Sequence, residues 1–190
     1  MRLEQLGLPG LTKIDFESFR DHRGTLSRCF DLPVFAETGL TTAWMQQVVS
    51  TTAKANTIRG MHVQRAPFTE AKLLVPLRGR MLWTVVDVRR GSPSFGHHLQ
   101  MELSPERDCG LFVAGGFAHG CLSLSDDVAL SILSDNRYSP EHGLGFRWDD
   151  VALGIPWPVD QNQPLVASQA HVELPSFATF VAQTGGITCL

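Results

Sequence analysis

The chain has 190 residues, of which 43% are hydrophobic and 18% charged, enough for one ordinary core and a single domain spanning residues 1–190. Its net charge of -3 and pI of about 6.1 create no field that attracts nucleic acid, and no apolar run approaches membrane-spanning length. Met1–Gln5 lacks the apolar core of a signal peptide, and the four cysteines show no CxxC spacing. We therefore expect a cytoplasmic protein with reduced thiols.

The first part of the chain alternates apolar and polar residues in several short stretches, the pattern of half-buried β-strands. Residues 11–16 suit an edge strand, and residues 25–30 predict a second strand after a turn at Asp21–Gly24, whose glycine supplies a positive φ. Residues 33–38 predict about one helical turn. Residues 44–52, which include two β-branched valines, predict a further strand. This part of the chain therefore indicates mainly β-structure.

Short strand candidates become dense after this point, and Gly, Pro, Ser or Asp separates most of them. They lie at residues 73–77, 79–89, 97–103, 109–113, 119–124 and 128–134. Several short strands at this spacing favour a sandwich or barrel over a parallel α/β sheet. Pro76, inside the first of these strands, indicates an edge strand or a bulge. The remaining chain is loop-like until a predicted helix at residues 174–183, which Gly185–Gly186 ends.

Two histidines and a lysine stand out in this pattern, namely His62, Lys72 and His119. A histidine that removes a proton beside a ketone needs a cation to hold the enolate oxygen, and Lys72 could supply it. His119 lies between Ala118 and Gly120, which leave its ring room. A lone histidine in a β-protein is more often structural, and His119 in that case merely caps a turn. Spacing alone leaves both interpretations open.

A metal site is the main alternative for these histidines, because jelly-roll sandwiches often carry histidine ligands. The usual pattern places two histidines two residues apart on one strand face. Here Gln64 stands two residues after His62, while His97 and His98 are adjacent and would point to opposite faces. We therefore predict no bound metal.

Two arginines are candidates for binding phosphate, because the guanidinium fork matches phosphate oxygens. They are Arg23, in the predicted turn, and Arg59, three residues before His62. The alternative for either one is a solvated arginine beside a turn.

An ordered set of motifs resembles one known family, the dTDP-4-dehydrorhamnose 3,5-epimerases. The matching segments cover most of the chain and are Asp21–Gly24, Arg59–His62, Lys72, Val86–Arg89 with Gly91–Gly96, Gly116–Gly120, Tyr138–His142 and Trp148–Pro158. The resemblance implies a cupin-like jelly-roll β-sandwich with short helical segments at its ends, no cofactor, and a homodimer paired through its amino-terminal strands. The implied substrate is a nucleoside-diphosphate 4-keto-6-deoxyhexose, whose ketone acidifies the hydrogens on C3 and C5.

The resemblance also implies what individual residues do. His62 is the base, Lys72 stabilises the enolate oxygen with His119 nearby, and Arg23 and Arg59 hold the diphosphate. Further positions that the resemblance assigns to substrate binding are Gln47, Tyr138 and Glu141. In the family, a tyrosine returns the proton on the opposite face of the sugar, and an aspartate orients the basic histidine.

The sequence departs from the family at these last two positions. The acid tyrosine is replaced by Ile132, and the aspartate is expected at Ala170 or His171. The chain's only tyrosine is Tyr138, which would lie about 20 Å from position 132 if residues 132–138 formed one strand. Two further differences are Val49, where the family has an asparagine, and Leu26, where an aromatic residue is expected.

We therefore expect an altered epimerase that abstracts the C3 and/or C5 proton through His62 and Lys72, and that inverts a single carbon or uses water as the acid. Cys121, which shares strand parity with His119, is a candidate proton donor. The alternatives are a binding protein that keeps the pocket without turnover, a 4-keto-sugar enzyme of a different reaction type, and a metal-dependent oxygenase.

Overall fold

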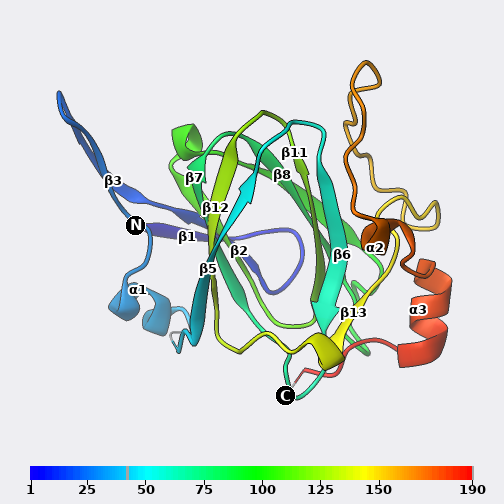
Figure 1. The fold of residues 1–190 in the computed structure, drawn as a ribbon. Coiled ribbons are helices and arrows are strands. Elements are labelled where there is room, and N and C mark those ends of the chain that lie inside the picture. The colour runs from blue at the N-terminus through cyan, green and yellow to red at the C-terminus, as the bar shows by residue number, and fades with distance from the viewer. Residues whose placement is uncertain (42, 190) are drawn as a thin grey trace.

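Two antiparallel sheets face each other in the computed structural model, which describes residues 1–41 and 43–189 (Figure 1). The six-stranded sheet has the order β1 (Arg2–Gln5), β2 (Leu11–Asp15), β10 (Cys109–Val113), β7 (Lys72–Arg78), β12 (Val128–Ser134), β5 (Gln46–Thr52). The five-stranded sheet has the order β13 (Gly143–Gly145), β6 (Ile58–Gln64), β11 (Phe117–Ser123), β8 (Met81–Asp87), β9 (His98–Leu103). This arrangement confirms the predicted jelly-roll sandwich.

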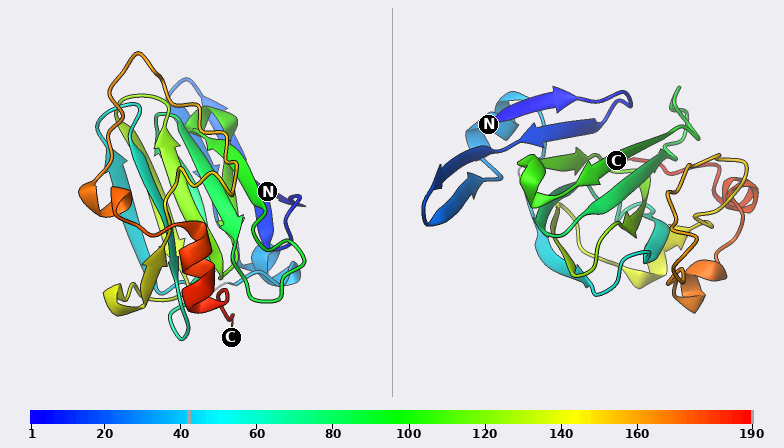
Figure 2. Two further views of the ribbon diagram at one scale, coloured as in Figure 1. Left: turned by 90° about the vertical axis from the view of Figure 1, so that its right-hand side faces the viewer. Right: turned by 90° about the horizontal axis from the view of Figure 1, so that it is seen from above.

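A two-stranded hairpin stands apart from both sheets. It consists of β3 (Glu17–Asp21) and β4 (Gly24–Arg28) and projects from the body of the molecule (Figure 2). The predicted turn closes it, and Gly24 adopts a φ of 137°, a conformation that favours glycine.

The helices are short and lie outside the sandwich. They are α1 (Leu32–Glu37), α2 (Gln169–Val172) and α3 (Phe177–Thr184), with 3-10 turns at η1 (Pro105–Arg107) and η2 (Pro140–His142). In α3 the Ser176 hydroxyl accepts a hydrogen bond from the Thr179 backbone N–H, and Gly185 ends the helix in the left-handed conformation. The helical segments predicted at 33–38 and 174–183 are confirmed. None of the helices in the described ranges has the length and apolar character of a membrane crossing.

The structure corrects the edge-strand expectation for residues 11–16 and confirms the bulge alternative at Pro76. β2 is not an edge strand, because the short and polar β1 pairs with it on the side opposite β10. β7, which contains Pro76, lies between β10 and β12. A register shift between Ala129 and Leu130, opposite Pro76, is the bulge that accommodates the proline.

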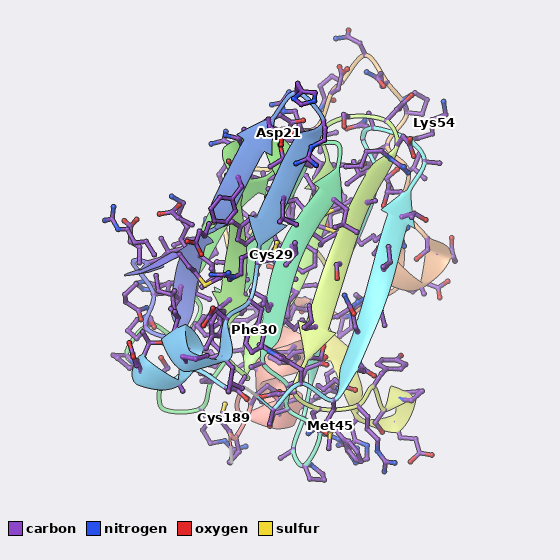
Figure 3. All side chains as sticks on the ribbon, turned by 90° about the vertical axis from the view of Figure 1, so that its left-hand side faces the viewer. Asp21, Cys29, Phe30, Met45, Lys54 and Cys189 are labelled. Carbon is purple, nitrogen blue, oxygen red and sulfur yellow. The ribbon has the colours of Figure 1, made fainter. Side chains whose placement is uncertain are left out.

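Apolar side chains fill three regions. Between the sheets lie Leu11, Leu74, Val85, Leu111, Phe117 and Leu130. Outside the five-stranded sheet, Phe180 of α3 packs on Met61 and Phe146. Outside the six-stranded sheet, on the face that Figure 3 shows, Phe35 of α1 packs against Leu73. Both outer faces are therefore partly covered, and the inter-sheet space is left to form a core and a pocket.

Candidate active site

A pocket of about 450 Å³ opens between the two sheets. One wall comes from the five-stranded sheet and carries Arg59, His62, Trp83, His119 and Cys121. The opposite wall comes from the six-stranded sheet and the segments next to it, and carries Ser50, Glu70, Lys72, Ile132 and Tyr138. The predicted His62, Lys72 and His119 therefore share one pocket.

A bulge in β6 brings Arg59 and His62 to the same wall. Residues three apart in a regular strand point to opposite faces. Here His119 pairs with His62 and Gly120 pairs with Gly60, so that β6 has one residue more than β11 at this point. Gly60 has a φ of 102°, and a Cβ atom there would lie 2.3 Å from the His119 carbonyl oxygen. The bulge therefore depends on glycine at position 60.

Trp83 fixes the protonation pattern of His119. The two rings are diagonal neighbours on β8 and β11, and the Trp83 indole N–H donates to His119 Nδ1 at 3.3 Å. Because Nδ1 accepts this bond, the proton of the neutral ring is on Nε2. Burial and the positive charges of Lys72 and His62 lower the pKa of His119 well below 6.5. His119 is therefore a neutral hydrogen-bond donor in this pocket.

His62 has a second histidine beside it. The short helix α2 lies next to β6 and places the His171 ring with its centroid 4.7 Å from that of His62. Desolvation by the surrounding protein, together with the positive charges of His171 and Lys72, lowers the pKa of His62 to about 4. Burial and the charge of Arg59 lower the pKa of His171 as well. His62 is thus unprotonated at neutral pH and able to accept a proton.

Lys72 is paired with a carboxylate. Its Nζ donates to Glu70 Oε1 at 2.6 Å, and the two side chains are only 19% and 9% exposed. Glu70 Oε2 is buried and has no hydrogen-bond partner among the described residues. An ammonium and a carboxylate therefore lie together on the wall that faces His62.

The altered position Ile132 and the predicted substrate-binding residue Tyr138 lie on the same wall. β12 ends at Ser134, so residues 132–138 do not form one strand, and both side chains line the pocket. The expected separation of about 20 Å along a strand therefore does not apply. The backbone N–H of Tyr138 donates to Gln46 Oε1 at 3.3 Å. Ile132 places hydrocarbon where the resemblance expects a hydroxyl.

Four sites in the amino-terminal half lie away from this pocket. Arg23 is on the projecting hairpin, 80% exposed and paired with Asp21, and Leu26 on the same hairpin is 73% exposed. Gln47 and Val49 pair with Leu133 and Ser131 on the outer face of the six-stranded sheet. There the Gln47 amide donates to the Ser131 hydroxyl at 2.8 Å.

Strand alternation explains the displacement of Gln47 and Val49. Val48 pairs with Ile132 and Ser50 pairs with Leu130, so the even-numbered residues of β5 face the pocket. Gln47 and Val49 therefore lie on the face of β5 that points away from this pocket.

Two other predicted positions lie outside the pocket lining. Glu141 is exposed in η2, where its backbone oxygen accepts a hydrogen bond from Arg65 at 3.3 Å. Ala170 is exposed on α2, and its neighbour His171 reaches His62 instead. The position of the expected aspartate therefore corresponds to His171.

Cys121 lines the pocket as strand parity predicts, but it lies on the wall of His62. Burial raises the pKa of its thiol to about 12. Both facts argue against Cys121 as the donor on the opposite face of a substrate.

In residues 1–41 and 43–189, no group of three or more His, Cys, Asp and Glu side chains has an arrangement that could hold a metal ion. His97 lies just before β9, and His98 is the first residue of that strand. Both are far in sequence from the histidines of the pocket.

Sequence reasoning missed two residues of the site, Glu70 and Trp83. Glu70 stands two residues before Lys72, and this i, i+2 spacing is the signal that could have placed both on one face. Trp83 gave no such signal, because an aromatic residue inside a strand usually belongs to the core.

Comparison with known proteins agrees with this geometry. The sequence profile described as dTDP-4-dehydrorhamnose 3,5-epimerase matches residues 5–179. A relative of that name from Sinorhizobium fredii is 37% identical over 83% of this chain and 81% of its own length.

Two solved structures are similar along most of their length. A dTDP-4-dehydrorhamnose 3,5-epimerase from Bacillus anthracis, with TDP and PPi bound, has a TM-score of 0.87 and 31% identity, covering 93% of this chain and 99% of that chain. A 3'-monoepimerase from Streptomyces bikiniensis in complex with dTDP-quinovose has a TM-score of 0.87 and 31% identity, covering 96% of this chain and 91% of that chain. The chain therefore belongs to the dTDP-4-dehydrorhamnose 3,5-epimerase family.

Proposed function

We propose that this protein is an epimerase that acts on a nucleoside-diphosphate 4-keto-6-deoxyhexose as a single jelly-roll domain. The observation that carries this proposal is that an unprotonated His62, a neutral His119 and the Lys72 ammonium line one pocket. The relatives named above include enzymes that act on dTDP-linked sugars.

The proposed chemistry starts with proton abstraction next to the ketone. An unprotonated ring nitrogen of His62 takes the proton from C3 or C5, and the electron pair of that C–H bond passes to the ketone oxygen. Lys72, together with the Nε2–H of His119, stabilises the resulting enolate oxygen. Water on the opposite face then gives a proton to that carbon as the enolate electron pair forms the new C–H bond, which inverts the carbon, and His62 releases its proton to solvent.

Arg59 supports binding of the diphosphate. It lines the pocket and is exposed, and within the described residues its guanidinium makes one long hydrogen bond, 3.4 Å, to the Thr51 carbonyl oxygen. Most of its donors are therefore available to phosphate oxygens.

Arg23 supports the proposal of a homodimer. It lies on the projecting hairpin and is not among the residues that line the pocket of its own protomer. An isolated two-stranded hairpin is marginally stable in water. This hairpin also exposes Phe19 and Leu26, which are cross-strand partners. We propose that the hairpin packs on a second copy and carries Arg23 to that copy's site.

Deuterium exchange tests the proposed activity. Incubation with dTDP-4-keto-6-deoxyglucose in deuterated water should replace hydrogen at C3 or C5, as observed by NMR. His62→Asn should slow the exchange by about 10²–10⁴-fold. Cys121→Ser, on the same wall, is the matched control and should retain most of the activity. Absence of exchange with this and other 4-keto sugar nucleotides would overturn the proposal.

Subunit mixing tests the dimer. A chain carrying His62→Asn and a chain carrying Arg23→Ala should each be impaired alone. When co-expressed, they should regain part of the activity, because one site of the mixed dimer has both residues intact. A protein that sediments as a monomer, or mixed chains that regain nothing, would contradict the proposal.

A second candidate function is sugar-nucleotide binding without turnover. Ile132 in the pocket wall favours it, because it leaves hydrocarbon where the family has an acid. Tight binding of the sugar nucleotide with no exchange at either carbon would select this alternative.

We also propose a cytoplasmic location, supported by the four cysteines, all free in the part of the chain that the structure describes.

A further inference from the structure

The charge pattern of the pocket is unusual for a site that must generate an imidazolium. When His62 takes a proton it becomes positively charged, beside His171 and facing Lys72. No carboxylate is adjacent to His62 on its own wall among the pocket residues described. The single carboxylate that lines the pocket within the described chain is Glu70, on the opposite wall.

We propose that Glu70 is a positioning residue that holds the Lys72 ammonium toward the substrate and supplies the negative charge that no carboxylate supplies beside His62. This inference rests on the proposed epimerase function and names a residue for it.

The Glu70–Lys72 contact has the geometry that this task requires. The oxygen–nitrogen distance is 2.6 Å, and both side chains are largely shielded from water, so their attraction is screened less than that of a surface pair. Lys72 lies at the start of β7, two residues from Leu74, and Leu74 pairs with Ile132. Glu70 therefore fixes the ammonium close to the position where the family has its acid.

The unpaired oxygen of Glu70 argues against a purely structural pair. A buried carboxylate oxygen without a hydrogen-bond partner carries its full desolvation cost. A carboxylate that served stability alone would gain from a second donor, and the described structure provides none. Retaining the charge at this cost is consistent with a function for the charge itself.

The positive charges that act on His62 and His119 all lower the pKa of these rings. Lys72 lowers the pKa of both His62 and His119, and His171 lowers that of His62 further. The other titratable groups among the described pocket residues are Arg59, Cys121 and Tyr138. Because Glu70 offsets the ammonium, its removal should make His62 a still weaker base.

The test combines Glu70→Gln with His171→Asp. Glu70→Gln keeps the shape of the side chain and removes its charge. We expect it to lower kcat for exchange roughly tenfold. His171→Asp places a carboxylate beside His62, and we expect the double variant to recover most of that loss. Glu106→Gln, which removes an exposed carboxylate outside the pocket lining, is the matched control and should leave kcat unchanged.

A second readout does not depend on turnover. In the His171→Asp background, the His62 ring is titrated by NMR with and without Glu70→Gln. A lower His62 pKa in the double variant supports the inference. An unchanged His62 pKa, or a Glu70→Gln defect that His171→Asp does not relieve, would overturn it. If the wild-type protein shows no exchange but the pKa shift is present, the proposed function fails and the assignment of Glu70 stands.

Discussion

The rings of His62 and His171 lie with their centroids 4.7 Å apart and their planes tilted by 54°. The side chain beside the proposed base is therefore a second imidazole, where the family resemblance calls for an aspartate. Burial is the main cause of the low His62 pKa of about 4, the positive charge of a protonated His171 lowers it further, and a second imidazole adds no negative charge that would offset either effect.

The pH dependence of activity should follow from this pairing. His62 acts only when unprotonated, so the wild-type rate should stay level as the pH falls from 8 through 6.5 and should decline only near the His62 pKa of about 4. His171→Asp should raise that pKa, because a carboxylate favours the charged ring, and should move the acid limb of kcat/KM toward 6.5. A pH–rate profile of both proteins measures the shift. Coincident acid limbs would show that position 171 does not influence His62.

Replacing Ile132 by tyrosine should change the frequency with which the carbon is inverted more than the rate at which its proton is removed. Ile132 and Lys72 line the wall that faces His62, so a hydroxyl at position 132 would lie on the side opposite the base. We expect Ile132→Tyr to raise the ratio of inversion to simple deuterium exchange, because proton delivery improves while abstraction by His62 is unchanged. NMR of the product measures both quantities. Ile132→Phe, which lacks the hydroxyl, is the control and should not raise the ratio.

Trp83 should affect catalysis through His119. Trp83→Phe removes the indole N–H that donates to His119 Nδ1, so both tautomers of His119 become available. A hydrogen bond of this kind is worth about 1 kcal/mol, so we expect kcat to fall roughly fivefold with little change in KM. The ¹⁵N shifts of His119 report the tautomer directly. A variant with reduced kcat but an unchanged Nε2–H tautomer would show that Trp83 acts by packing alone.

Asp87 should govern stability in acid. Burial alone would raise its pKa, but hydrogen bonds from Arg89, Ser92 and Ser94 outweigh burial and lower the pKa to about 2. A carboxylate with a lowered pKa stabilises the fold above its ordinary value of 3.8, and this contribution is lost as the pH falls toward 2.

Asp87→Asn should therefore lower the free energy of unfolding by about 2–3 kcal/mol at pH 7. The difference from wild type should shrink between pH 4 and pH 2. Urea denaturation at several pH values measures both effects. Asp149→Asn removes an exposed partner of Arg147 and should cost less than about 1 kcal/mol. An Asp87→Asn deficit that stays constant down to pH 2 would contradict this assignment.

Most of the fold could be predicted from the sequence because strand alternation is a local property. The strands at residues 72–78, 81–87 and 109–113 appear within two residues of their expected positions. β1 and β13 were missed because strands of three or four residues carry too little pattern to read. Neighbouring strands, and not their own sequence, place them in the sheets.

Part of the candidate site could be predicted in the same way. His62, Lys72 and His119 are side chains of unusual type in strands of ordinary pattern, and the structure places all three in one pocket. The substrate-binding role of Gln47 stays a prediction, because strand alternation places Gln47 and Val49 on the face of β5 that points away from the pocket. Which side chains reach the pocket depends on strand register, and not on the β-propensity of single residues.

The sequence by itself determined a β-rich fold and the residue types from which a base, a cation and a phosphate-binding arginine are predicted, because residue type and two-residue periodicity are local properties of the chain. Only the tertiary structure decided three relationships: a bulge at Gly60 turns Arg59 and His62 toward one wall, α2 carries His171 to His62, and the hairpin removes Arg23 from its own pocket. Each of these relationships either joins segments that are far apart in sequence or interrupts the regular alternation of side chains along a strand. Contacts of that kind depend on how sheets pack and pair, and no local pattern encodes them.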